Sequence, residues 1–212
     1  MINYKPYGDS GLLIEIGNEI SEEINNKVLT FTNLIENELG SIIVETIPAY
    51  NSVLIIYDPL EIDYENLISK VKVLEENISD INKVQNRIIL IPTTYGGEYG
   101  EDLKVVAEYN DLTEEEVIDI HSGTLYRVYM LGFTPGFPYL GGMSKKIETP
   151  RKKTPRKRIE KGSVGIGGKQ TGIYSTNSPG GWQIIGRSPL ELFDIKKSKS
   201  LINPGDFLKF ES

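Results

Sequence analysis

The only histidine in the chain, His121, is the side chain whose unperturbed pKa lies nearest neutrality. This makes it the natural candidate for proton transfer, and it is the one candidate catalytic residue. It also falls at the expected end of a helix, where the helix dipole favours a cation and a capping role is the alternative. One histidine and no cysteine exclude a multi-histidine or thiolate metal site within the chain, so no metal is expected.

Three arginines stand beside residues that stiffen or crowd the backbone. Arg151 and Arg156 each follow a proline, and Arg187 follows a glycine. A guanidinium held on such a turn loses little entropy when it grips a carboxylate or a phosphate with two hydrogen bonds. All three are candidate ligand-binding residues, with exposed surface charge as the alternative.

Basic residues are concentrated in residues 145–161, whereas residues 1–84 are strongly acidic. Such a basic stretch suits phosphate, nucleic acid, a carboxylated substrate or an acidic protein face, and a solvated loop is the alternative. The net charge of -7 opposes the non-specific phosphate attraction on which nucleic-acid binders rely. We therefore expect no nucleic-acid partner.

Residues 132–142 and 178–182 are rich in glycine, proline and aromatic residues. Proline removes a hydrogen-bond donor and glycine weakens regular structure, so residues 132–142 are predicted to form a shaped loop rather than a helix or a central strand. Aromatic side chains on such a loop suit either a packed core turn or a ligand or partner surface. Trp182, which follows two glycines, has the same two interpretations.

A glycine-rich segment, residues 162–170, resembles a phosphate-binding loop at first sight. The match fails because Ser163 stands where the first glycine is required and Gln170 stands where the motif has Ser or Thr. A dinucleotide fingerprint starting at Gly165 fails at the same glutamine. The segment is therefore predicted to be a glycine-rich strand with a bulge, and not a self-contained ATP site.

The elements that must position these residues fall into two groups. Before residue 92, β-branched runs and helical spacings predict strands at 12–16, 42–47, 53–57 and 87–91 and helices at 21–39 and 63–74. The order β-α-β-β-α-β is the ferredoxin-like pattern of an α+β domain.

After Pro92 the chain changes in character. Helices are predicted at residues 103–109 and 113–121, the second with a capping box formed by Thr113 and Glu116. Six short strands follow, at residues 125–130, 163–166, 172–174, 182–185, 190–193 and 206–210. Many short strands with close turns indicate a barrel or a sandwich. We place the boundary near residues 84–95, with an α+β domain at 1–90 and a mostly β domain at 91–212.

The composition of the 212 residues is that of a globular protein, with 39% hydrophobic and 25% charged residues. The longest apolar runs are too short to span a bilayer, and the N-terminus lacks the features of a signal peptide. A cytoplasmic protein with no membrane contact is expected.

Ordered blocks of the sequence resemble the allophanate hydrolase subunit 1 family, which includes the B subunit of bacterial ATP-dependent 5-oxoprolinase and the sporulation kinase inhibitor KipI. These blocks are His121 and residues 95–98, 126–128, 131–140, 150–151, 155–156, 162–164, 170–174, 178–182 and 185–187. One departure is Glu101, where the family has proline, and it affects only a turn.

The resemblance implies a cyclophilin-like β-barrel for the second domain and an α+β first domain. It also implies partners, which are an A subunit and a C subunit that is itself made of related barrels. Together the three would open 5-oxo-L-proline to L-glutamate at the expense of ATP. The isolated chain is then expected to be inactive. The alternatives are a KipI-like inhibitor that binds a sporulation histidine kinase, and an allophanate- or urea-related amidolysis.

For the site, the resemblance implies that both glycine-rich segments line a groove completed by the C subunit, with His121 and Tyr126 as polar groups within it. The arginines would meet the substrate carboxylate or a phosphorylated intermediate. The residues expected to bind substrate are Tyr126, Phe133, Pro135, Gly136, Phe137, Tyr139, Arg151, Arg156, Gln170, Tyr174, Gly180, Gly181, Trp182 and Arg187.

Overall fold

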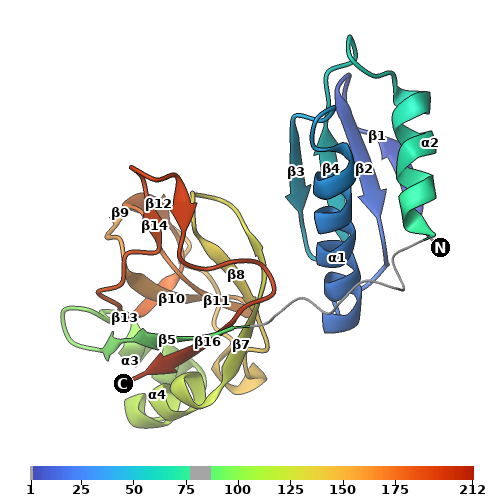
Figure 1. The fold of residues 1–212 in the computed structure, drawn as a ribbon. Coiled ribbons are helices and arrows are strands. Elements are labelled where there is room, and N and C mark those ends of the chain that lie inside the picture. Colours follow the sequence, from blue (N-terminus) through green and yellow to red (C-terminus); the bar gives the residue numbers. More distant parts are fainter. Residues whose placement is uncertain (1, 77–86) are drawn as a thin grey trace. The chain divides into compact units, whose positions relative to one another are not determined.

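A computed structural model describes residues 2–76 and 87–212 (Figure 1). The chain divides into two compact units, Met1–Gln85 and Asn86–Ser212, and each is described by itself.

The first unit is one antiparallel sheet with two helices packed on one of its faces. The strands lie in the order β1-β2-β4-β3. Alternate residues of β2 and β4, among them Leu12, Ile14 and Val53, are buried with Phe31 of α1 and Leu67 of α2 in one core. The elements are β1 Asn3–Pro6, β2 Gly11–Glu15, α1 Glu22–Leu39, β3 Glu45–Pro48, β4 Ser52–Ile56 and α2 Tyr64–Glu75.

Both helices begin where the sequence predicts. The Ser21 side chain accepts a hydrogen bond from the backbone N–H of Ile24, and the Asp63 carboxylate accepts one from Asn66. These caps satisfy N–H groups that the first turn of a helix leaves unpaired.

The order of elements in this unit is β-β-α-β-β-α, which corrects the predicted β-α-β-β-α-β order. Strand β1 was missed because Asn3–Pro6 is a short, mostly exposed edge strand without apolar alternation. The strand predicted at residues 87–91 exists as β5, Ile88–Pro92, but it pairs in parallel with β16, Phe207–Glu211, in the second unit. A strand pattern predicts a strand and does not identify its partner.

The second unit is mostly β, and its described residues include two α-helices and one short 3-10 helix. Its remaining elements are β6 Thr94–Tyr95, α3 Leu103–Tyr109, α4 Glu114–Gly123, β7 Leu125–Leu131, β8 Pro138–Gly141, the 3-10 helix η2 Lys145–Ile147, β9 Arg156–Ile159, β10 Ser163–Gly167, β11 Gln170–Ile173, β12 Ser178–Gly180, β13 Gln183–Arg187, β14 Phe193–Asp194 and β15 Lys199–Ser200. Both predicted helices are present, and the capping box of Thr113 and Glu116 is formed.

Two four-stranded sheets, ordered β5-β16-β7-β8 and β11-β10-β13-β6, and two strand pairs, β12-β9 and β14-β15, make up this unit. The strand pairing of the described residues does not join them into one closed barrel, so of the predicted barrel only the mixed, mostly β character is present. Residues 190–193, predicted as a strand, contribute only Phe193 to β14. The core brings together side chains such as Val106 of α3, Val164 of β10 and Leu208 of β16.

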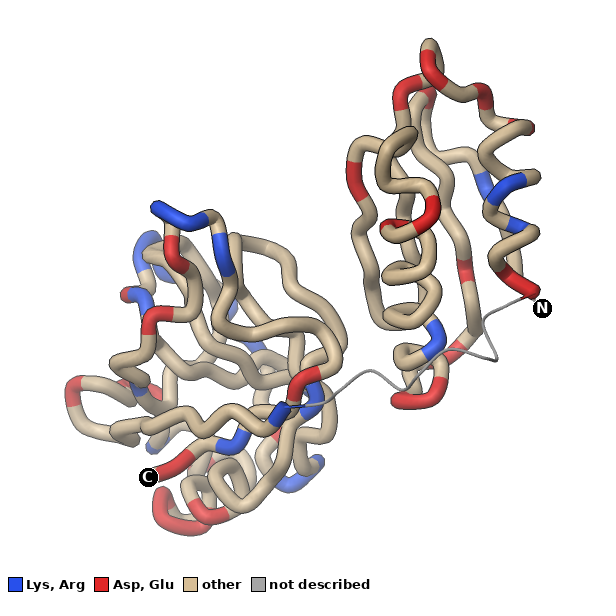
Figure 2. The backbone as a smooth tube through the Cα atoms, in the orientation of Figure 1, with Lys and Arg blue, Asp and Glu red and all other residues tan. Residues whose placement is uncertain are grey.

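Figure 2 shows Asp and Glu predominating on the first unit, whereas most Lys and Arg lie on the second. The segregation of charge in the sequence therefore follows the division into units. Among the described residues, no helix is long and apolar enough to cross a membrane.

Candidate functional site

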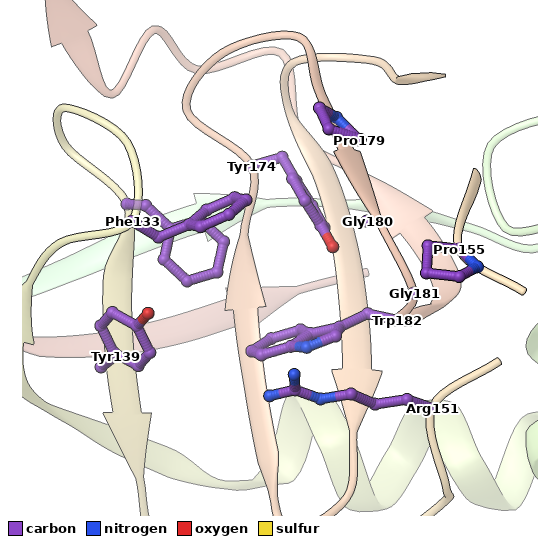
Figure 3. Close-up of a pocket in the computed structure, with 10 residues that line it drawn as sticks. Phe133, Tyr139, Arg151, Pro155, Tyr174, Pro179, Gly180, Gly181 and Trp182 are labelled. Atoms are coloured by element: carbon purple, nitrogen blue, oxygen red, sulfur yellow. The ribbon is translucent and has the colours of Figure 1, made fainter. Parts of the chain in front are cut away.

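A pocket of about 250 Å³ opens in the second unit where the two glycine-rich segments meet (Figure 3). One wall comes from the β7–β8 segment, and the opposite wall comes from β12 and the residues that follow it. A third segment, which leads into β9, contributes a cationic side chain. The lining residues are Phe133, Phe137, Tyr139, Arg151, Pro155, Tyr174, Pro179, Gly180, Gly181 and Trp182.

Phe137 lies at the centre of the aromatic lining. Its ring centroid is 5.4 Å from Tyr139, 5.5 Å from Tyr174 and 5.6 Å from Trp182, and each pair is nearly perpendicular. Edge-to-face contacts of this kind are favourable and hold each ring in one orientation. The apolar wall is therefore fixed before a ligand arrives.

The turn before Phe137 is shaped by Gly136. Its φ of +77° favours glycine, and an added Cβ would lie 2.9 Å from the Cβ of Phe193. Phe133 also has a positive φ, of 63°, and is 60% exposed, so a bulky side chain is held in a rarely populated conformation at the mouth of the pocket. Strand β8 begins at Pro138, inside the segment that was predicted to be irregular throughout.

Gly180 gives the Tyr174 side chain its space, because an added Cβ would lie 2.4 Å from the Tyr174 hydroxyl oxygen. Burial raises the pKa of Tyr174, whereas a hydrogen bond and the nearby arginines lower it. The effect of burial is the larger, so the pKa lies above its ordinary value. The hydroxyl therefore keeps its proton at neutral pH. In Figure 3 it points toward the side of the pocket formed by Gly181 and Trp182.

Arg151 is the only charged residue of the pocket lining. Its guanidinium carbon lies 5.8 Å from the ring centroid of Trp182, which is within the range of a cation–π contact. No carboxylate pairs with Arg151 in the described part of the chain. An exposed arginine stacked on an indole can therefore receive an anion in two hydrogen bonds.

Arg156, by contrast, is committed to Asp102. One terminal nitrogen of its guanidinium donates to both carboxylate oxygens, at 2.8 and 2.7 Å, and Lys152 donates to the same carboxylate at 2.8 Å. The backbone N–H of Ile184 donates to it as well, at 2.7 Å. Burial alone would raise the pKa of Asp102, but the hydrogen bonds from Arg156 and Lys152 hold it below its ordinary value.

The Asp102 cluster ties the segment that carries Arg151 to the start of β13. Glu101 adds an ion pair with the Nε atom of Arg156 at 2.9 Å. The residue that departs from the family pattern thus supports this cluster. Asp102 was not identified from the sequence, because nothing local distinguishes it from other surface acids.

His121 lies in the core and not in the pocket. It is fully buried, with Nδ1 2.8 Å from the Tyr95 hydroxyl and Nε2 2.8 Å from the Thr171 hydroxyl. The Thr171 hydroxyl donates to the Gly165 carbonyl, so it accepts from Nε2–H, and Nδ1 accepts from Tyr95. Burial lowers the pKa of His121 to about 3.

The other predicted site residues that do not line the pocket lie elsewhere in the second unit. Tyr126 is buried, and its hydroxyl donates to the His121 carbonyl at 3.0 Å. Arg187 packs over the Tyr99 ring at 5.6 Å, and Gln170 begins β11. Pro135 and Gly136 line a separate, open hollow formed by residues 131–136 of the β7–β8 segment.

The structure therefore gathers Phe133, Phe137, Tyr139, Arg151, Tyr174, Gly180, Gly181 and Trp182 around one pocket. It does not bring His121, Tyr126, Gln170, Arg156 or Arg187 to that lining. Pro155 also lines the pocket and was not predicted to do so, whereas Pro179 belongs to the predicted segment 178–182. Among the described residues, no group of three His, Cys, Asp or Glu side chains is placed to hold a metal ion.

Comparison with known proteins gives matches along nearly the whole chain. The chain is 46% identical to the B subunit of 5-oxoprolinase from Bacillus subtilis (strain 168), covering 96% of this chain and 89% of the relative. It is 28% identical to the urea amidolyase of Saccharomyces cerevisiae, of which it covers 13%. A crystal structure of TTHA0988 matches with a TM-score of 0.83 at 33% identity over 100% of this chain, and the chain spans 40% of that protein.

The family model described as "Carboxyltransferase domain, subdomain C and D" matches residues 2–202. Because the match extends over both units, the chain belongs to the family of carboxyltransferase subdomains C and D.

Proposed function

We propose that this chain is the B subunit of an ATP-dependent 5-oxoprolinase that opens 5-oxo-L-proline to L-glutamate together with A and C subunits. The observation that carries the proposal is the 46% identity to the B subunit of a 5-oxoprolinase, with both chains covered almost completely. We expect the complex in the cytoplasm, where ATP is available.

The side chains of the aromatic pocket support this proposal. 5-Oxoproline is a five-membered lactam with one carboxylate, so it has a compact apolar ring and a single negative charge. The ring would lie against Phe137 and Trp182, and the carboxylate would be bound by Arg151. The protonated Tyr174 hydroxyl would donate to the lactam carbonyl, whose oxygen gains negative charge when the carbon is attacked.

Hydrolysis breaks the bond between the ring nitrogen and the carbonyl carbon, and water supplies the oxygen of the new carboxylate. An amide is a poor electrophile, so ATP would be used to activate the lactam for attack by water. The glycine-rich residues 162–170 lack the pattern of a phosphate loop. We therefore propose that the complex uses ATP at a site to which its other members contribute, and that the isolated chain is inactive.

The test is the assembled complex of all three proteins carrying Arg151→Gln in this chain. We expect the KM for 5-oxoproline to rise by about tenfold or more, because a charge-assisted pair is lost, while the complex still assembles. Arg158→Gln is the matched control, since Arg158 is exposed and its one ion pair among the described residues is with Glu160, two positions along the chain. Unchanged kinetics for Arg151→Gln would show that the pocket does not bind the substrate carboxylate through Arg151.

A complex that assembles but does not turn over 5-oxoproline would contradict the function itself. An allophanate- or urea-related amidolysis has less support, because the urea amidolyase relative is only 28% identical and far longer than this chain. Inhibition of a histidine kinase stays a prediction from the family resemblance. Inhibition of kinase autophosphorylation by the purified chain would support that alternative.

A further inference from the structure

A second hollow, of about 410 Å³, lies beside the aromatic pocket, and we call it the basic hollow. One side is the exposed surface of α3, and the other is the segment between η2 and β9. Arg151 lines both cavities, so the two are adjacent at this residue. The lining residues are Val105, Tyr109, Thr149, Pro150, Arg151, Lys152, Lys153, Thr154 and Gln183.

The lining of the basic hollow carries three cations and no acid. Lys152 is partly neutralised, because it donates to the Asp102 carboxylate, which also holds Arg156. Arg151 and Lys153 have no carboxylate partner among the residues that the structure describes. The hollow therefore keeps positive charge within a protein whose net charge is -7.

The backbone that carries these cations is held in place at several points. Lys152 N–H donates to the Gly181 carbonyl at 2.7 Å, and Thr149 and Gly168 exchange two backbone hydrogen bonds. The buried Gln183 side chain donates to the Pro150 carbonyl at 2.9 Å. Residues on both sides of Arg151 are thus fixed, so little entropy of the main chain is lost when an anion binds.

We infer that the basic hollow binds the phosphoryl group of a phosphate-bearing ligand. Arginine offers a fork of donors that matches phosphate geometry, and lysine acts as a compact positive charge beside it. The exposed Thr154 lines the same hollow and carries a hydroxyl group that can donate to a phosphate oxygen. Tyr109, which is 59% exposed, adds an aromatic surface for the rest of such a ligand.

The phosphoryl group could belong to a nucleotide or to a phosphorylated small molecule bound partly in the aromatic pocket. Both share the chemistry that the hollow recognises. This inference goes beyond the proposed function, because it concerns an affinity of the chain alone and would hold if the complex acted on another amide.

The test uses the full chain and amide chemical shifts in low salt. Inorganic phosphate, pyrophosphate, ATP and adenosine are titrated separately. We expect saturable shifts at the amides of Thr149, residues 151–154 and Gln183 with at least one phosphate-bearing probe. Lys153→Gln should weaken that binding by about tenfold, the loss of one charge-assisted contact. The matched control is Lys157→Gln, since Lys157 is exposed on β9 and outside the hollow.

Saturation with ATP alone would identify a nucleotide, whereas saturation with phosphate or pyrophosphate would identify the phosphoryl group as sufficient. No saturable shift with any phosphate probe, equal weakening by Lys157→Gln, or equal binding of adenosine would each overturn the inference. These outcomes do not depend on turnover of 5-oxoproline, so failure here is distinguishable from failure of the proposed function.

Discussion

At the scale of single residues, charge and burial separate the groups that can meet a ligand from those that stabilise the fold. Arg151 and Arg156 stand in similar sequence contexts, yet Arg151 is exposed on the Trp182 ring and Arg156 is paired to Asp102. His121 is held neutral between Tyr95 and Thr171. Because a buried neutral histidine resists protonation, it makes the free energy of unfolding depend on pH.

The pKa of His121 predicts a loss of stability in weak acid. In the unfolded chain His121 binds a proton near pH 6.5, whereas in the folded chain it does so only near pH 3. The stability that the neutral side chain contributes to the folded state is therefore fully present above pH 6.5 and is lost as the pH falls toward 3. Between pH 7.5 and pH 5.5 this side chain should lower the unfolding free energy of the second unit by about 1.4 kcal/mol.

Urea unfolding followed by the fluorescence of Trp182, the only tryptophan, measures this unit. His121→Gln removes the titration, so its unfolding free energy should change less between the same two pH values. Equal pH dependence of the parent and the variant would contradict the assigned neutral state.

At the scale of elements, the Asp102 cluster joins the start of α3, the segment that leads into β9 and the start of β13. Its member Lys152 lines the basic hollow, and the cluster holds the segment that carries Arg151. Buried charges that lose their partner are strongly destabilising, so this cluster determines how well the site is formed.

Asp102→Asn is therefore expected to destabilise the second unit by about 3 kcal/mol, because Arg156 and Lys152 lose their counter-charge. Glu101→Gln is the matched control, since Glu101 is 60% exposed and its pair with Arg156 should contribute less than about 1 kcal/mol. Thermal unfolding followed by Trp182 fluorescence measures both variants. Similar losses of stability for the two variants would contradict the conclusion that Asp102 holds this cluster together.

At the scale of the whole molecule, each of the two units has a core of its own. Residues such as Leu12 and Phe31 form the core of the first unit, and Val164 and Leu208 belong to the core of the second. The aromatic pocket and the basic hollow are both lined by residues of the second unit alone.

We therefore propose that residues 86–212 fold alone as a domain. The fragment should unfold cooperatively, with the same Trp182 emission maximum as the full chain, because its core and its pocket are internal to it. Circular dichroism and fluorescence of the purified fragment measure this. A fragment without a cooperative transition would show that the second unit depends on the first.

Several features of the fold could be predicted from the sequence because they rest on local interactions. The caps at Ser21 and Asp63 and the capping box at Thr113 depend on residues three positions apart. The helices were therefore predicted nearly to their ends. Short strands such as β7 and β10 follow from their apolar and β-branched residues. The glycine, proline and aromatic residues of two segments left a packed turn and a binding surface equally open, and the family resemblance favoured the groove.

Only the tertiary structure decided which segments meet. The pairing of β5 with β16 joins segments more than a hundred residues apart, and no local pattern encodes that choice. Likewise, Arg156 differs from Arg151 only because Asp102 lies opposite it, and His121 is excluded from the pocket only because Phe210 and Tyr126 pack around its ring. Residue type determined what each side chain can do, whereas long-range packing determined its burial, its partner and thus its charge.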